Sequence, residues 1–434
     1  MNPRKNHVKK LLLTIILLIA VSLLAPKFIG GVVETEHQSG VNKLNENPAI
    51  TIDSTSFTRN WFGGKATTEM TILLQDEEIE SITIIIEENL LFGPVIFTDE
   101  GLALALSYSQ ADINFKELFL DEEIEAFINN KIHLTGLLTF SKQIVANIVV
   151  DKVSKEIDGN KVASAKAVGH FTLENNNRLY GDFQWAGLKA TTNDESFTIE
   201  KVQFSLDQTL IAGDYYQGNT ISTGDFDFSL ASVKAIDATG SMVFALDNLL
   251  VNAISAVNND LMTITMKYSA DKIVTADQQL ENANLDVILN GLNINVMQEI
   301  STLMAELSAD GEKTFSQENM KELSVLTAKL LVDDPVVDIK DLSVLTPDGK
   351  IESSMQLSVD KKSFDTTNIM SIIPAIIADA NGKAPMPFFT KLGLAPMVDI
   401  YVQQGLIIQK EEELSFTANF AQGQLKVNGQ VIPM

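Results

Sequence analysis

Side chains that could perform acid–base or metal chemistry are few in this chain and lie far apart. There are four histidines and no cysteine, so the sequence excludes disulfides, thiolate nucleophiles and thiolate metal sites. His7 and His37 precede the predicted strands, and His133 and His170 are too distant in sequence to predict a shared site. A metal centre needs several such ligands together. We therefore expect no metal site, no cofactor and no catalytic residue.

Two patterns match catalytic motifs in their letters alone. Ser358 and Lys361 have the SxxK spacing, which works where the serine begins a helix and the lysine lies one turn later. Here they end a strand-like segment. The acidic runs 121–123 and 411–413 place carboxylates together, but such runs are usually solvated faces. The chain has no GxSxG elbow, HExxH pair, nucleotide loop or EF-hand loop, which favours a non-enzymatic protein.

Two segments rich in aromatic residues are better candidates for a binding site. The first is a tight turn, residues 59–62, whose two rings would lose contact with water only if something covers them. The second, residues 372–389, is apolar and broken by prolines, as a lid over an apolar groove or a lipid-facing surface would be. For both segments the simpler alternative is packing on their own sheet. The predicted partner-binding residues are Arg59, Trp61, Phe62, Met386, Phe388 and Phe389.

The elements that must position these residues are mostly strands. Alternation of apolar and polar residues begins at Ala49 and returns over residues 131–292, cut by Gly and Asn turns. Two further hairpins are predicted, around Gly349 and around Gly423. Helical spacing predicts helices over residues 113–130 and 293–332, and an apolar stretch broken by prolines predicts a third helical region over 364–405. The second of these is expected to be a pair of helices, with a break at residues 308–311 and a capped helix start at Ser316. The fold class expected is α+β: a large, mostly antiparallel twisted sheet with a few covering helices.

The N-terminal sequence predicts one transmembrane helix before this sheet. Residues 1–10 carry four basic side chains, and residues 11–25 carry no charge. Fifteen helical residues cover only about 22 Å of an apolar layer that is about 30 Å thick. The apolar sequence resumes after Pro26 and reaches Val33, which would make a span over residues 11–33 long enough.

A cleaved signal peptide is the alternative for this segment. Pro26 directly after Ala25 argues against cleavage there, and the absence of cysteine excludes a lipoprotein anchor. The basic tail, residues 1–10, would lie in the cytoplasm. The protein is therefore expected in a bacterial inner membrane as a single-pass protein, with the bulk of the chain in the periplasm.

Beyond the predicted span the chain is strongly acidic. Residues 34–434 contain 27 basic and 57 acidic residues, a net charge of −30, which opposes binding to nucleic acid. Residues 34–48 are polar and predict a short stalk or an extension of the helix. Residues 49–434 form the predicted body, with two sub-lobes divided near 293–332.

Several motifs, in their order along the chain, resemble those of the YdgA-like family of bacterial membrane-anchored envelope proteins. The apolar N-terminal segment is followed by a turn with an aromatic residue and a glycine at residues 56–63, and then by Gly93-Pro94. A helix end, Asp334-Pro335 and a strand pair fill residues 330–360, and residues 427–430 resemble the closing strand. The resemblance implies an envelope protein without an assigned activity, and it supplies no catalytic residues.

Three functions stay open from the sequence alone. The first is a periplasmic protein that binds a lipid, a peptide or an envelope protein through an amphipathic sheet. The second is a structural scaffold that forms homo-oligomers through exposed sheet edges. The third is an uncharacterised envelope hydrolase, which would need polar groups that converge in a pocket.

Overall fold

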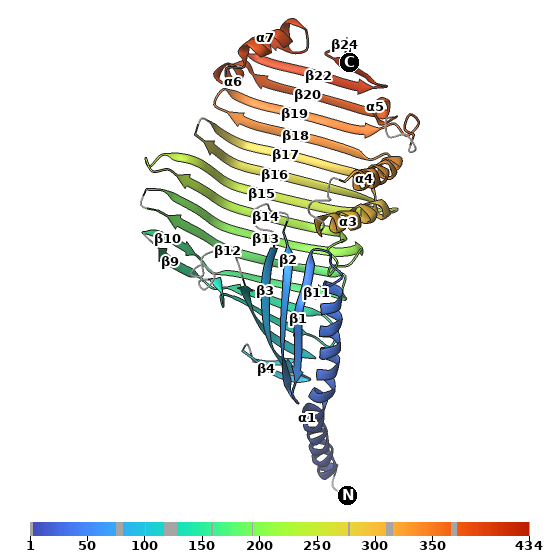
Figure 1. The fold of residues 1–434 in the computed structure, drawn as a ribbon. Helices are drawn as coiled ribbons and strands as arrows, with labels where there is room; N and C mark the ends of the chain where they lie inside the picture. Colours follow the sequence, from blue (N-terminus) through green and yellow to red (C-terminus); the bar gives the residue numbers. More distant parts are fainter. Residues whose placement is uncertain are drawn as a thin grey trace. The chain divides into compact units, whose positions relative to one another are not determined.

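A computed structural model shows a chain built mainly of antiparallel strands, with 60% of it in strands and 20% in helices (Figure 1). By their internal contacts the residues form two compact units. Unit 1 comprises Met1–Val153, Lys166–Phe183 and Asp214–Gly218, and unit 2 comprises Ser154–Ala165, Gln184–Gly213 and Asn219–Met434. The structure describes residues 3–74, 81–99, 101–116, 128–157, 159–192, 194–276, 278–309, 316–365 and 371–433, with only the backbone over 3–21, 157, 308–309 and 318.

Unit 1 is a long helix packed on an antiparallel sheet in the order β1–β2–β3–β6–β7–β8–β11, with a separate small hairpin, β4–β5. Short segments in which apolar and polar residues alternate form these strands, and side chains on one face of the sheet pack against the helix. Its elements are α1 (Pro3–Leu44), β1 (Ile50–Arg59), β2 (Gly63–Leu73), β3 (Ser81–Phe92), β4 (Val95–Thr98), β5 (Gly101–Leu104), β6 (Ser107–Lys116), β7 (Ile132–Leu138), β8 (Ile144–Val150) and β11 (Ala167–Glu174).

The second half of the predicted transmembrane segment packs on the strands of unit 1. Val33 forms a buried cluster with Ala66, Leu90 and Phe92, and Ile29 packs against that cluster. Ile29 and Val33 therefore belong to a protein core, which accounts for their apolar character. Among the helices that the structure describes, none is both long and apolar enough to cross a membrane. The predicted span over residues 11–33 is therefore not supported.

The helix predicted over residues 113–130 is wrong at its start, although residue 128 near its end is helical. Residues 113–116 end strand β6, and Phe115 lies opposite Ile84 of β3. Pairing with β3 stabilises an extended backbone in a segment whose spacing also fits a helix. Residues 117–127 lie outside the described part of the chain. The segment after the predicted span continues helix α1 as far as Leu44.

Unit 2 consists mainly of antiparallel strands, which follow one another in the order β13–β14–β15–β16–β17–β18–β19–β20–β22–β23–β24. Strand β10 pairs with the second half of β12, and β21 with β22. The strands are β9 (Val153–Ile157), β10 (Asn160–Ser164), β12 (Arg178–Thr191), β13 (Ser196–Ala212), β14 (Ile221–Ile236), β15 (Met242–Asn258), β16 (Leu261–Thr275), β17 (Gln279–Asn293), β18 (Val336–Thr346), β19 (Gly349–Val359), β20 (Ile376–Pro385), β21 (Ile408–Lys410), β22 (Glu413–Ala421), β23 (Gln424–Val427) and β24 (Gln430–Ile432). The first residue of β9 and residues 178–183 of β12 belong to unit 1.

The helix pair predicted over residues 293–332 is confirmed. Helices α3 (Ile294–Ala309) and α4 (Gln317–Leu330) flank the predicted break, and the short 3-10 helix η2 (Leu331–Asp333) follows α4. The Ser316 side chain caps α4 by accepting a hydrogen bond from the Asn319 backbone N–H at 3.2 Å. Buried Met262, Ile221 and Ile294 join the start of α3 to the ends of strands β14 and β16.

The helical region predicted over residues 364–405 is only partly helical. Helices α5 (Ile372–Ala375), α6 (Met386–Lys391) and α7 (Ala395–Gln403) are short, and strand β20 lies between α5 and α6. Residues 376–385 alternate in burial and pair with both β19 and β22, which overrides the apolar composition that favoured a helix. The α+β class is therefore wrong: the described chain is mostly antiparallel sheet.

Candidate binding face of unit 2

One face of the sheet in unit 2 carries apolar side chains in two neighbouring cross-strand rows, which we call the apolar face. The strand register sets the rows, since each residue lies opposite the next across the sheet. The first row is Leu206, Phe226, Ala253, Met266, Val287, Ile339, Met355, Ala380, Ala418 and Val427. The second row is Phe204, Phe228, Val251, Tyr268, Leu285 and Leu342.

Alternation within each strand produces this face. In β14, Phe226 and Phe228 alternate with the exposed Asp225 and Asp227. Because successive side chains of a strand point to opposite sides, an alternating sequence gives a sheet with one apolar and one polar face. A register shifted by one residue would mix the two sets, so the pairing in unit 2 is what keeps the apolar rows continuous.

The opposite face is polar, and many of its groups pair with one another. Its contacts include Asn252 Nδ2 to Asp227 Oδ1 at 2.8 Å, Asn419 Nδ2 to Asp379 Oδ1 at 2.8 Å, and Lys267 Nζ to Asp286 Oδ2 at 4.0 Å. On β19 the hydrogen bond from Lys350 lowers the pKa of the Glu352 carboxyl group. The same bond raises the pKa of the Lys350 amine. The charges of this sheet are therefore concentrated on the side away from the apolar face.

The apolar face is only half covered. All members of the two rows are half-buried, apart from Leu342, which is exposed. A sheet face covered by helices would bury such side chains almost fully. Figure 1 shows α3 and α4 at one end of the strands of unit 2. The described clusters of buried apolar residues at α3 and α4 include no member of either row.

A hollow of about 460 Å³ lies on this face, over strands β15–β19. Its lining is mostly aliphatic and includes Leu249, Ala270, Leu285 and Ile351. Tyr268 also lines it, and the Tyr268 hydroxyl donates a hydrogen bond to the Met266 sulfur at 3.5 Å. A hollow of this composition offers van der Waals contact and little hydrogen bonding, which suits a hydrocarbon ligand.

The first predicted binding segment, residues 59–62, lies in unit 1. The Trp61 indole Nε1 donates a hydrogen bond to the Leu23 carbonyl oxygen of α1 at 2.7 Å. Arg59 Nη1 lies 3.5 Å from Glu34 Oε2. The Trp61 and Phe62 rings are 44% and 52% exposed. The turn is thus fixed by its polar atoms while its rings face outward, and its role in partner binding stays a prediction.

The second predicted binding segment lies in unit 2, on helix α6. Met386, Phe388 and Phe389 are half-buried, and the two phenylalanine rings make an edge contact with centroids 5.4 Å apart. The Met386 N–H donates to the Glu412 carbonyl oxygen at 2.7 Å. These residues follow strand β20 and are not members of the two rows. The two predicted segments therefore belong to different compact units.

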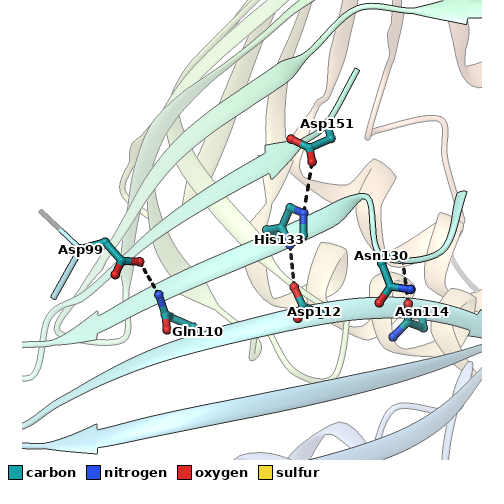
Figure 2. Close-up of polar contacts among 7 residues, drawn as sticks. All are labelled: Asp99, Gln110, Asp112, Asn114, Asn130, His133 and Asp151. Carbon is teal, nitrogen blue, oxygen red and sulfur yellow. Dashed lines mark hydrogen bonds and ion pairs between the residues drawn. The ribbon is translucent and has the colours of Figure 1, made fainter. Parts of the chain in front are cut away.

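In unit 1, His133 lies between the carboxylates of Asp112 and Asp151 at the protein surface (Figure 2). His133 Nδ1 lies 2.6 Å from Asp112 Oδ1, and Nε2 lies 3.5 Å from Asp151 Oδ2. All three side chains are more than a third exposed. His170 Nδ1 lies 2.7 Å from Asn147 Oδ1. Among the residues that the structure describes, no group of three or more acidic and histidine side chains is placed to hold a metal ion.

Sequence reasoning missed the apolar face as a set of residues, although the signal was present in each strand. The alternation in β14, β16 and β17 indicates which residues share a face within a strand. It does not indicate which strand lies beside which, and the rows depend on that order.

Comparisons with known proteins place the chain in a bacterial family. A family described as bacterial protein of unknown function (DUF945) matches residues 8–434, nearly the whole chain. The match does not confirm the narrower YdgA-like name. No curated protein matches the sequence.

Proposed function

The chain belongs to DUF945, a bacterial family of unknown function, and we propose from its geometry that the apolar face of unit 2 binds the hydrocarbon chains of a lipid. The observation that carries the proposal is the continuity of the first row, which crosses strand after strand from Leu206 to Val427 with no charged side chain. Antiparallel strands lie about 4.8 Å apart, so ten strands give a row roughly 43 Å long. One leaflet of a bilayer core is only about 15 Å thick, so an acyl chain fits along the row.

A lipid suits this face better than a peptide does. The backbone groups of the strands already pair within the sheet, and the two rows offer almost no side-chain donors or acceptors. A peptide laid on them would leave its own N–H and C=O groups without partners, which costs about 1–3 kcal/mol for each group. A hydrocarbon chain has no such groups, and its burial against the rows contributes about 25 cal/mol for each Å² removed from water.

The test compares two substitutions that introduce the same charge at neighbouring positions of β16. Met266→Asp places a carboxylate in the first row, and Thr265→Asp places one on the polar face. Binding of a fluorescent fatty acid is measured by titration, and lipids that co-purify with each protein are identified by mass spectrometry. We expect Met266→Asp to weaken binding at least tenfold, about 1.4 kcal/mol, and Thr265→Asp to leave it within twofold.

Two results would overturn the proposal. One is equal affinity of both variants for the fatty acid while each keeps the circular dichroism and thermal unfolding of the parent. The other is a parent protein that carries no lipid and does not bind the probe. A shift from dimer to monomer in Met266→Asp alone would instead support the scaffold function, with the apolar face covered by a second copy. The periplasmic location expected from the sequence stays a prediction.

A further inference from the structure

The hairpin β4–β5 of unit 1 presents an apolar surface to the outside. It pairs only with itself, with Val95 opposite Leu104 and Phe97 opposite Leu102. Ile96 points the other way and is buried against Tyr108. Phe97, Leu102 and Leu104 are 76%, 62% and 65% exposed. An exposed hairpin face made only of apolar side chains is unexpected on a surface that meets water alone.

Two other exposed apolar segments lie at the same end of unit 1. The turn of residues 60–62 follows β1, and the Phe92 N–H donates to the Phe62 carbonyl oxygen at 2.8 Å. Only Gly93 and Pro94 separate Phe92 from β4, which Figure 1 shows near this end of β1–β3. The bond from Trp61 to Leu23 joins the turn to α1, where Phe28 is 75% exposed.

We call this set the aromatic tip. It consists of Phe28, Trp61, Phe62, Phe97, Leu102 and Leu104.

The charges around the aromatic tip favour a phospholipid surface as its partner. The Lys27 amine lies 5.0 Å from the centroid of the Trp61 ring, so a cation and an amphipathic ring are side by side. Trp and Lys with these properties are common where proteins meet the headgroup layer. Asp99, at the turn of the hairpin, accepts a hydrogen bond from Gln110 Nε2 at 2.5 Å, so its carboxylate is held toward β6 (Figure 2).

The sequence next to the aromatic tip points to the same partner. In a chain with a net charge of −25, residues 11–22 of α1 contain no charged side chain, and the ten residues before them contain four basic and no acidic ones. Apolar and basic residues in this arrangement attract a surface that is apolar inside and anionic outside. A protein partner would need no such adjoining stretch.

We propose that the aromatic tip docks on the surface of a phospholipid bilayer, with the hairpin β4–β5 inserted to the depth of the upper acyl chains. The docking surface is in unit 1 and does not depend on lipid binding by the apolar face of unit 2. Trp61 marks the level of the headgroups, where its indole ring meets both apolar and polar surroundings.

The chain contains no cysteine, so single cysteines report on single positions. Full-length Leu102→Cys and Ala238→Cys are labelled with an environment-sensitive dye, the second as a control on an exposed turn of unit 2. Each is mixed with vesicles of phosphatidylethanolamine and phosphatidylglycerol that contain brominated acyl chains. We expect the dye at residue 102 to shift to the blue and to lose at least half its emission, while the dye at residue 238 does not change.

A second experiment separates the contribution of the hairpin β4–β5 to vesicle binding from the contribution of α1. Phe97→Ser with Leu104→Ser removes two exposed apolar side chains, and Leu250→Ser with Ile254→Ser removes two in unit 2. We expect the first pair to reduce co-sedimentation with the vesicles at least threefold and the second pair to leave it unchanged. The proposal is overturned if the dye at residue 102 stays unquenched in vesicle-bound protein. It is also overturned if both pairs bind vesicles as the parent does, or if the first pair alters only self-association.

Discussion

Gly30 of helix α1 lies so close to Phe92 of strand β3 that a β-carbon on Gly30 would stand 2.6 Å from two atoms of the Phe92 ring. The ring cannot move aside easily, because Phe92 is only 2% exposed and packs with Val33 and Leu90. The close approach of helix and strand therefore depends on the missing side chain at residue 30. Glycine is otherwise unfavourable within a helix by about 1 kcal/mol relative to alanine.

Gly30→Ala is expected to destabilise unit 1 by about 1–3 kcal/mol, since the added methyl group overpacks the contact with Phe92. Gly40→Ala is the matched control, because its nearest neighbour would be Tyr216 at 4.0 Å. The control should gain up to about 1 kcal/mol from its higher helix propensity. Urea unfolding measures both changes. Equal effects of the two substitutions would show that α1 does not pack on β3 as described.

Met262 provides the corresponding test in unit 2. Its side chain is 2% exposed and packs with Ile221 and Ile294 where α3 meets the sheet. Met262→Ala should lower the free energy of unfolding by about 2–5 kcal/mol, because it leaves a cavity in a packed cluster. Met242→Ala, at an exposed position, should change it by less than about 0.5 kcal/mol. A small loss at Met262 would contradict the docking of α3 at the strand ends.

The sequence predicts local structure well where one signal dominates. The alternation of Asp225, Phe226, Asp227 and Phe228 predicts a strand with two unlike faces, and the structure confirms it. Ser316 predicts the start of a helix, and its side chain caps α4 as expected. These signals involve residues a few positions apart, so the chain order alone is enough to read them.

Features that depend on distant pairing could not be predicted in this way. The spacing around Phe115 also fits a helix, and only the pairing of Phe115 with Ile84 of β3 shows that this segment is a strand. Hydropathy predicts a membrane span that includes Ile29 and Val33, whereas their contacts with the cluster around Phe92 place them in a protein core. The apolar face depends on the order of ten strands, which no single alternating segment contains.

The turn between β14 and β15 makes a prediction about pH. Asp237 Oδ1 accepts hydrogen bonds from the Thr239 hydroxyl at 2.7 Å and from the Ser241 N–H at 2.9 Å. The Thr239 side-chain bond, followed by the Ser241 bond, lowers the pKa of the Asp237 carboxyl group in the folded protein. The turn is therefore stabilised above the ordinary aspartate pKa, and this contribution is lost as pH falls through the lowered value.

Thr239→Val removes the hydroxyl donor and should raise the pKa of Asp237 toward its ordinary range, whereas Thr239→Ser keeps the donor and should leave it low. Carbon-13 NMR of the carboxyl group as a function of pH measures both. The hydrogen-bond geometry of the turn is incorrect if the Val and Ser variants titrate alike.

The hollow on the apolar face allows a test of ligand binding that adds no charge. Ala283 lines it opposite Ala270, and a larger apolar side chain there would occupy the space that a hydrocarbon chain would fill. Ala283→Phe is therefore expected to reduce fatty-acid affinity about tenfold while the protein keeps its stability, since the new ring gains apolar contacts.

Ala256→Phe adds the same ring on the polar face of β15, where Ala256 is exposed, and should leave affinity unchanged. Isothermal titration with a soluble fatty acid measures both affinities, and thermal unfolding checks both folds. Unchanged binding by Ala283→Phe would place the ligand elsewhere on the molecule, because a filled hollow cannot also hold a chain.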